Sequence, residues 1–248
     1  MNLLLLEEGE FEIPLSDPRA SHVRKILKLT TGDTVRAGII DGPLVSCTIA
    51  DIDDHCVRLN VSDRFEPPRP APVELLLGHP RPIVLRRMLR DLGSLGVSRI
   101  HVTATALGEK SYLSSGVWDD TDRLLREGAA QGGFTHLPTL LRHPSLGKAI
   151  AALESGSATR ITLHPSAGPE IPSLHEALGA VHEWPAAVAV GSERGWTDGE
   201  LQTLAEAGFR RAHLGAPVLR TEVATAVAVW AARAAWEQRT GAGESPAQ

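Results

Sequence analysis

The chain has 248 residues, of which 42% are hydrophobic and 22% charged. This composition is ordinary for a globular protein, so it excludes wholesale disorder and allows one large or two small domains. The net charge of −5 does not indicate a nucleic-acid binder, although unevenly spread charge can still form a basic patch. The two cysteines are too few for a disulfide framework, and no run approaches the roughly 20 apolar residues of a membrane span. We therefore expect a cytoplasmic protein.

The first elements in the chain predict a small β domain. Residues 34–40, 44–52 and 56–61 are rich in Val, Ile and Thr and are separated by turn residues. One helix precedes them, with Pro18 in its first turn and Ser16 or Asp17 as its N-cap. Together these elements predict a small barrel with one helix.

A proline-rich connector follows this unit. Four prolines lie between residues 67 and 72, where neither a helix nor a central strand tolerates them. The connector predicts two domains, one over residues 1–68 and one over residues 72–240.

The second unit alternates strands with helices. We expect strands at 73–77, 99–104, 161–163, 186–190 and near Ala212, and helices at 82–95, 118–131, 146–153, 174–181, 197–207 and about 221–237. Such alternation predicts a mostly parallel sheet that helices cover on both faces.

A glycine-containing loop, Gly191–Gly195, follows an apolar strand and precedes a helix that Thr197 and Glu200 can open as a capping box. Open α/β sheets bind ligands at the carboxyl ends of their strands, and glycine lets the backbone approach a ligand closely. The alternative is an ordinary turn between a strand and a helix.

A second loop, Leu214–Leu219, also leaves a strand and leads into a helix. Arg220 and Glu222 lie at the start of that helix, where the macrodipole disfavours a cation. This placement of Arg220 indicates contact with a phosphate or a base. The alternative is that Arg220 pairs with Glu222 or another surface carboxylate.

In order, these elements are a strand, G-x-E-x-G, a capped helix, a strand, L-G-x-x-(V/I)-L-R-x-E and a long Ala-rich helix. The chain in this respect resembles the 16S ribosomal RNA uracil-N3 methyltransferase family of the SPOUT class. His22–Lys28 with Gly32-Asp33 is similar to that family's PUA-like RNA-binding domain. Leu95–Val97, Glu109–Ser111 and Leu163–Pro165 also fall in matching places.

The resemblance implies an α/β fold: a trefoil-knotted SPOUT methyltransferase domain after a small PUA-like β-barrel domain. It implies a homodimer that uses S-adenosylmethionine to methylate uridine N3 in 16S ribosomal RNA or the small ribosomal subunit. The cofactor would lie against three loops of the knot, formed here by Leu163, His164, Val190, Gly191, Glu193, Gly195, Leu214, Gly215, Val218, Leu219 and Thr221.

Two residues have the chemistry that methylation of uracil N3 requires. Arg220 could stabilise the developing uracil anion, and Glu222 could accept the N3 proton, so we expect both to be catalytic. A carboxylate such as Glu193 or Glu222 would also favour the cationic sulfonium of the cofactor.

Basic residues gather in two stretches despite the negative net charge. We expect RNA contacts from Arg24, Lys25, Lys28, Arg81, Arg86 and Lys110. The alternative is that these residues belong to solvated helix faces. The histidines lack paired ligand spacing, which predicts no metal site.

Three positions depart from the family pattern. Ser192 and Arg194 stand where the family usually has Pro and Gly, and the stretch before Phe134 lacks a Glu and an Arg. Two alternatives therefore stay open: a methyltransferase of the same fold that modifies another RNA nucleotide, and a catalytically silent RNA-binding protein of ribosome assembly.

Overall fold

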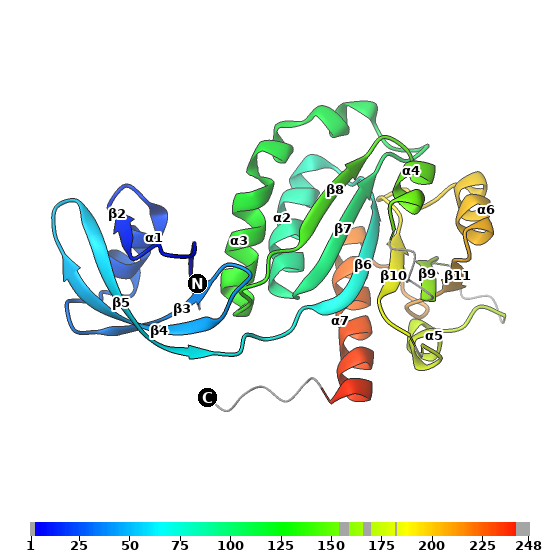
Figure 1. The fold of residues 1–248 in the computed structure, drawn as a ribbon. Helices are drawn as coiled ribbons and strands as arrows, with labels where there is room; N and C mark the ends of the chain where they lie inside the picture. Colours follow the sequence, from blue (N-terminus) through cyan, green and yellow to red (C-terminus); the bar gives the residue numbers. More distant parts are fainter. Residues whose placement is uncertain (1–2, 154–158, 166–169, 182, 242–248) are drawn as a thin grey trace.

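Two β-sheets organise the protein, as Figure 1 shows for a computed structural model that describes residues 3–153, 159–165, 170–181 and 183–241. A curled sheet forms the N-terminal part, and a larger sheet covered by helices forms the rest (Figure 1). An extended segment of residues 66–70 joins them at the predicted proline-rich connector.

The N-terminal sheet has the order β1 (Leu4–Leu6), β3 (Thr34–Ile39), β4 (Leu44–Ile52), β5 (Cys56–Phe65) and β2 (Glu12–Pro14). The outer strands β1 and β2 do not pair with each other, so the sheet is a curled half-barrel. Its alternating side chains form a core that includes Leu6, Ile13, Ile49 and Val57. The strands β3, β4 and β5 match the prediction, whereas the three-residue strands β1 and β2 were not predicted.

The single helix expected in this unit has two parts. Asp17 accepts a hydrogen bond from the backbone N–H of Arg19 at 2.8 Å and so caps α1 (Pro18–Ser21). The chain then widens into one π-helical turn, η1 (His22–Ile26), which buries Val23 and leaves Arg24 exposed. This wider turn presents the basic residues of the segment to solvent.

The larger sheet is wholly parallel. Its order is β11 (Arg210–Ala212), β9 (Thr159–Leu163), β10 (Ala186–Val190), β6 (Ala71–Gly78), β7 (Val97–Thr103) and β8 (Thr139–His143). The prediction of a parallel sheet is confirmed, and the edge strand β8 is an addition to it. Because the chain moves outward to β8 and returns on the other side at β9, the order reverses beside β10 and β6.

Helices cover both faces of this sheet, as predicted. One face carries α2 (Pro82–Ser94), α3 (Thr121–Gly132), α5 (Leu174–Gly179) and α7 (Thr221–Thr240), and the other carries α4 (Leu146–Ala151) and α6 (Asp198–Glu206). In α2 the apolar residues recur at helical spacing, so Leu85, Met88, Leu89 and Leu92 are all buried against the sheet. No helix in the described ranges is long and apolar enough to cross a membrane.

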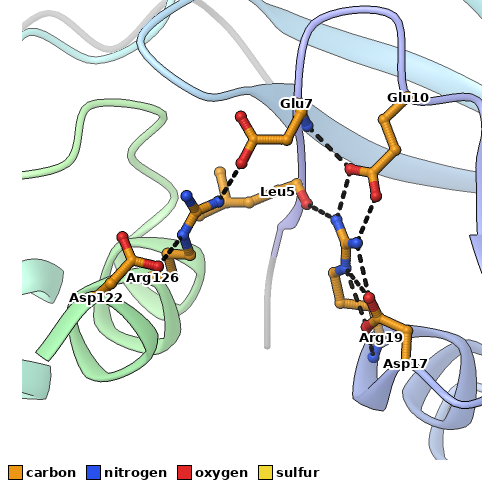
Figure 2. A network of polar contacts seen from close by, with 7 residues as sticks. All are labelled: Leu5, Glu7, Glu10, Asp17, Arg19, Asp122 and Arg126. Atoms are coloured by element: carbon orange, nitrogen blue, oxygen red, sulfur yellow. Dashed lines mark hydrogen bonds and ion pairs between the residues drawn. The ribbon is translucent and has the colours of Figure 1, made fainter. Parts of the chain in front are cut away.

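The N-terminal sheet docks onto α3 of the larger domain. Leu3 and Leu5 pack against Ala129 and Phe134 in one apolar cluster. Beside that cluster, Arg126 of α3 pairs with Glu7 at 2.7 Å and with Asp122 at 2.7 Å (Figure 2). Apolar burial and an ion pair together therefore fix the position of the N-terminal domain.

Candidate functional site

A cavity of about 740 Å³ opens where the strand order reverses. Three loops surround it, and they leave the carboxyl ends of β9, β10 and β11. All the residues predicted to contact the cofactor line this cavity: Leu163, His164, Val190, Gly191, Glu193, Gly195, Leu214, Gly215, Val218, Leu219 and Thr221. The structure thus brings together three loops that are separate in the chain, the first beginning at Leu163 and the last at Leu214.

The loop after β10 is a tight turn. The N–H of Gly195 donates to the carbonyl of Ser192 at 2.8 Å, and Gly195 has a φ of 72°, which glycine adopts without strain. A Cβ at Gly191 would lie 2.8 Å from the Cα and C atoms of Gly195, so a side chain there would open the turn. The predicted capping box is confirmed: Thr197 and Glu200 together open α6 directly after the loop.

Glu193 connects this loop to a neighbouring helix. Its Oε1 atom accepts a hydrogen bond from the backbone N–H of Arg81 at 2.9 Å, at the start of α2. The first N–H groups of a helix lack partners within the helix, and the N-cap Arg81 has no side-chain oxygen with which to satisfy them. The carboxylate of Glu193 therefore stabilises the start of α2 and holds Arg81 at the cavity.

The loop after β11 leads directly into α7. The N–H of Gly215 donates to Nδ1 of His213 at 2.9 Å, and Gly215 has a φ of 104°. Arg220 is the N-cap of α7, and its side chain is exposed, whereas Glu222 is half-buried in the first turn. Both residues line the cavity. Within the described part of the chain neither makes an ion pair, so the surface pairing considered for Arg220 is not found.

Apart from Arg86, the residues predicted to bind RNA lie in and after η1, in a 3-10 turn, and at the cavity. Arg24, Lys25 and Lys28 are exposed in and after η1, and Lys110 is exposed in the 3-10 turn η2 (Lys110–Ser114). Arg81 lines the cavity instead of lying on a separate surface.

Carboxylates engage Arg86, which was predicted to bind RNA, and Arg19, which precedes Arg24 in the chain. Arg86 pairs with Asp120, and this arginine is the main reason that the pKa of Asp120 is lowered. Arg19 pairs with Glu10 at 2.6 Å and Asp17 at 2.8 Å, and it also donates to the carbonyl of Leu5 (Figure 2). Arg19 is therefore engaged within the domain, whereas Arg24, Lys25 and Lys28 are exposed to solvent.

Sequence reasoning missed several residues that line the cavity. Val84 and Ala224 come from α2 and α7, Trp196 directly follows the loop Gly191–Gly195, and Pro217 lies within the loop Leu214–Leu219 without having been assigned a role. Pro217 and Trp196 could have been found from their place in the two motifs. The contribution of α2 depends on β6 lying next to β10, and no local pattern in the sequence indicates that pairing.

The departures from the family pattern leave the cavity intact. Ser192 is buried in the tight turn that it closes with Gly195. Phe134 is buried between the two domains, with the guanidinium of Arg233 4.9 Å from its ring centre. Phe134 therefore has a packing role at the domain junction.

Comparison with known proteins identifies relatives along nearly the whole chain. Residues 67–233 match the family model described as RNA methyltransferase domain. The chain is 34% identical to ribosomal RNA small subunit methyltransferase E of Treponema pallidum, over 96% of this chain and 94% of that protein. It is 31% identical to ribosomal RNA small subunit methyltransferase E 1 of Borreliella burgdorferi, over 92% of this chain and 95% of that protein.

The architecture also matches a solved structure. Ribosomal RNA small subunit methyltransferase E from Neisseria gonorrhoeae, bound to S-adenosyl methionine, aligns with a TM-score of 0.73 and 21% identity over 96% of this chain and 98% of that chain. At this identity the likeness establishes the fold alone. It confirms the predicted α/β SPOUT-class architecture with a small N-terminal β domain.

Proposed function

The chain belongs to the RNA methyltransferase family, in which its relatives are named ribosomal RNA small subunit methyltransferase E. We propose that it uses S-adenosylmethionine to methylate N3 of a uridine in 16S ribosomal RNA. The observation that carries this proposal is the convergence of three strand-end loops on one cavity, with Arg220 and Glu222 beside them.

The cavity has the properties that S-adenosylmethionine requires. Its volume of about 740 Å³ lies within the range of sites that enclose small organic ligands. Leu163 and Val190 are buried and provide an apolar wall for an adenine ring. Gly191 and Gly195 line the cavity, so a ligand can approach their backbone closely, and the carboxylate of Glu222 favours a cation nearby. When bound, the cofactor supplies an electrophilic methyl group.

The roles that we propose for the catalytic residues follow from the chemistry of uracil. N3 carries a proton at neutral pH and becomes nucleophilic only as that proton leaves. Glu222, in the first turn of α7, accepts the proton. The guanidinium of Arg220 stabilises the negative charge that develops on the uracil ring.

The exposed basic residues support a path for RNA. Arg24, Lys25 and Lys28 on the N-terminal domain would bind phosphates, as would Lys110 in η2 and Arg81 at the cavity. Arg86 can join them only by exchanging Asp120 for a phosphate. With 16S ribosomal RNA or the small ribosomal subunit as its partner, the enzyme would act in the cytoplasm.

An exposed apolar stripe on α7 supports a homodimer. Val223, Val227 and Trp230 recur at helical spacing, and Trp230 is 61% exposed. Ile83 at the start of the adjacent α2 is also 63% exposed. We propose that a second copy of the chain covers this stripe, next to the cavity that Ala224 of the same helix lines.

Methylation of purified small ribosomal subunits tests the proposal. Subunits from a strain that lacks the protein are incubated with it and S-adenosylmethionine, and their nucleosides are identified by mass spectrometry. We expect 3-methyluridine at one position. Another methylated nucleoside would favour a same-fold enzyme with a different target. No product, together with no S-adenosylmethionine binding by calorimetry, would favour the catalytically silent alternative.

A further inference from the structure

The segment between β7 and η2, residues 104–109, lies against the loop after β10. It leads directly to Lys110, one of the residues proposed to bind RNA. Arg194 of this loop and Glu200 of the following helix, α6, hold two adjacent residues of the segment. The proposed cofactor loop and the proposed RNA-binding turn are thus linked by named contacts.

Glu200 uses both of its carboxylate oxygens. Oε2 accepts from the backbone N–H of Thr197 at 2.8 Å and from its hydroxyl at 2.9 Å, which completes the cap of α6. Oε1 accepts from the backbone N–H of Ala106 at 2.8 Å, 94 residues earlier in the chain. One carboxylate therefore fixes the start of α6 and the segment after β7 at once.

A second capping box in the chain shows that capping does not need the second oxygen. Glu176 at the start of α5 accepts from the N–H and hydroxyl of Ser173 through Oε2 alone, at 2.7 Å each. Among the described residues Glu176 forms no hydrogen bond to another element. The contact between Glu200 and Ala106 is thus an addition to the cap.

Arg194 makes the second link. Its Nη1 atom donates to the carbonyl of Leu107 at 3.4 Å, directly after the residue that Glu200 holds. Packing beneath these contacts is tight, because a Cβ at Gly78 would lie 2.7 Å from the N atom of Ser192 and 2.8 Å from Cγ2 of Thr105. The segment and the loop therefore cannot shift independently without losing contacts.

We propose that Glu200 and Arg194 are positioning residues that couple the cofactor loop to the RNA-binding turn. They hold residues 104–109 so that Lys110 faces RNA when the loop after β10 is in its closed turn. This inference rests on the proposed function of the site. A cofactor bound against the loop after β10 holds that loop in its turn and so strengthens RNA binding at Lys110. Because coupling between two binding sites is reciprocal, bound RNA then strengthens cofactor binding by the same factor.

The variant Glu200→Gln separates the two contacts of Glu200. Glutamine has one side-chain oxygen, so it can cap α6 or accept from Ala106 but cannot do both. We expect the KM for small-subunit ribosomal RNA to rise about fivefold, as for the loss of one hydrogen bond. The Kd for S-adenosylmethionine without RNA should stay within about twofold of the wild type. Amide hydrogen exchange over residues 104–110 should become faster.

Glu176→Gln is the matched control. Its cap uses one oxygen only, so the variant should keep the KM for RNA and the exchange rates of the wild type. Arg194→Gly should also raise the KM for RNA. In the double variant Glu200→Gln with Arg194→Gly, the KM for RNA should rise by less than the product of the two single increases, because both residues hold one segment.

The outcomes distinguish this inference from the function on which it rests. If the wild type binds both S-adenosylmethionine and RNA but Glu200→Gln matches it in KM and in exchange, the coupling is wrong and the function stands. A Glu200→Gln variant that loses cofactor binding without RNA also overturns the coupling, since the residue then supports the cofactor loop alone. If the wild type binds neither ligand, the proposed function fails and the inference fails with it.

Discussion

Arg220 and Glu222 are the residues on which the proposed chemistry depends most. We expect Arg220→Ala to lower the single-turnover rate of methyl transfer by about 10²–10³-fold, because a positioned cation stabilises developing charge. Glu222→Gln should lower it by about 10²-fold or more, because it removes the proton acceptor. Exposed Arg210 on β11 is the control, and Arg210→Ala should keep the wild-type rate. Near-normal rates in both site variants would contradict these roles.

Two buried or half-buried histidines make stability depend on pH. Burial lowers the pKa of His79, and burial together with the neighbouring His101 lowers the pKa of His143. A histidine that is neutral when folded gains a proton on unfolding once the pH falls below about 6.5. The stabilisation is therefore complete above that pH and is lost as the pH falls.

We expect the free energy of unfolding to decrease between pH 7.5 and 5.5, by at most about 1.4 kcal/mol per pH unit for each histidine. Urea unfolding followed by tryptophan fluorescence measures it. His79→Gln and His143→Gln should each flatten this dependence, whereas His55→Gln, at an exposed position, should not. An unchanged stability of the wild type across this range would contradict the prediction.

At the scale of elements, the turn after β10 depends on the absence of a side chain at Gly191. We expect Gly191→Ala to weaken S-adenosylmethionine binding by at least about tenfold. Its Cβ would clash with backbone atoms of Gly195, which can move only if the turn opens. Calorimetry measures the affinity. A Cβ at Gly199 in the next helix would have no atom within 4 Å, so Gly199→Ala should bind normally and stabilise α6 by about 0.5–1 kcal/mol. Equal affinity in both variants would contradict this account.

The strands that sequence reasoning missed share one property. Strands β1, β2 and β8 have three to five residues and lie at the ends of their strand orders. Thr139–His143 has no alternation of buried and exposed side chains, since one neighbour and a helix cover it only in part. Their extended shape comes from pairing with a distant strand, which a short local pattern does not encode.

At the scale of the whole molecule, the stripe on α7 predicts the oligomeric state. A charge at Trp230, 61% exposed in the single chain, would oppose burial of this stripe against a second copy. We expect the wild type to be a dimer by light scattering, and Trp230→Glu to raise the dimer Kd by about tenfold or more. Phe11→Glu, at an exposed apolar residue of the other domain, should remain dimeric. A monomeric wild type would contradict the proposed dimer.

The sequence by itself determined the parallel α/β unit and the small β domain before it, and its resemblance to a known family indicated the loops that line the cavity. These features depend on patterns between near neighbours: apolar spacing in α2, the capping box of Thr197 and Glu200, and glycines after apolar strands. Backbone geometry within one element produces such patterns, so they can be recognised in the sequence without knowledge of the tertiary structure.

Only the tertiary structure decided which charged residues are free of carboxylate partners, and which loops are joined by hydrogen bonds. Arg86 and Arg19 are engaged by carboxylates, Arg81 is held at the cavity by Glu193, and Glu200 reaches the backbone of Ala106. Each contact joins segments brought together by sheet order and domain docking. Because the free energy of such a contact depends on the distance between its two groups in the fold, no spacing along the chain could reveal it.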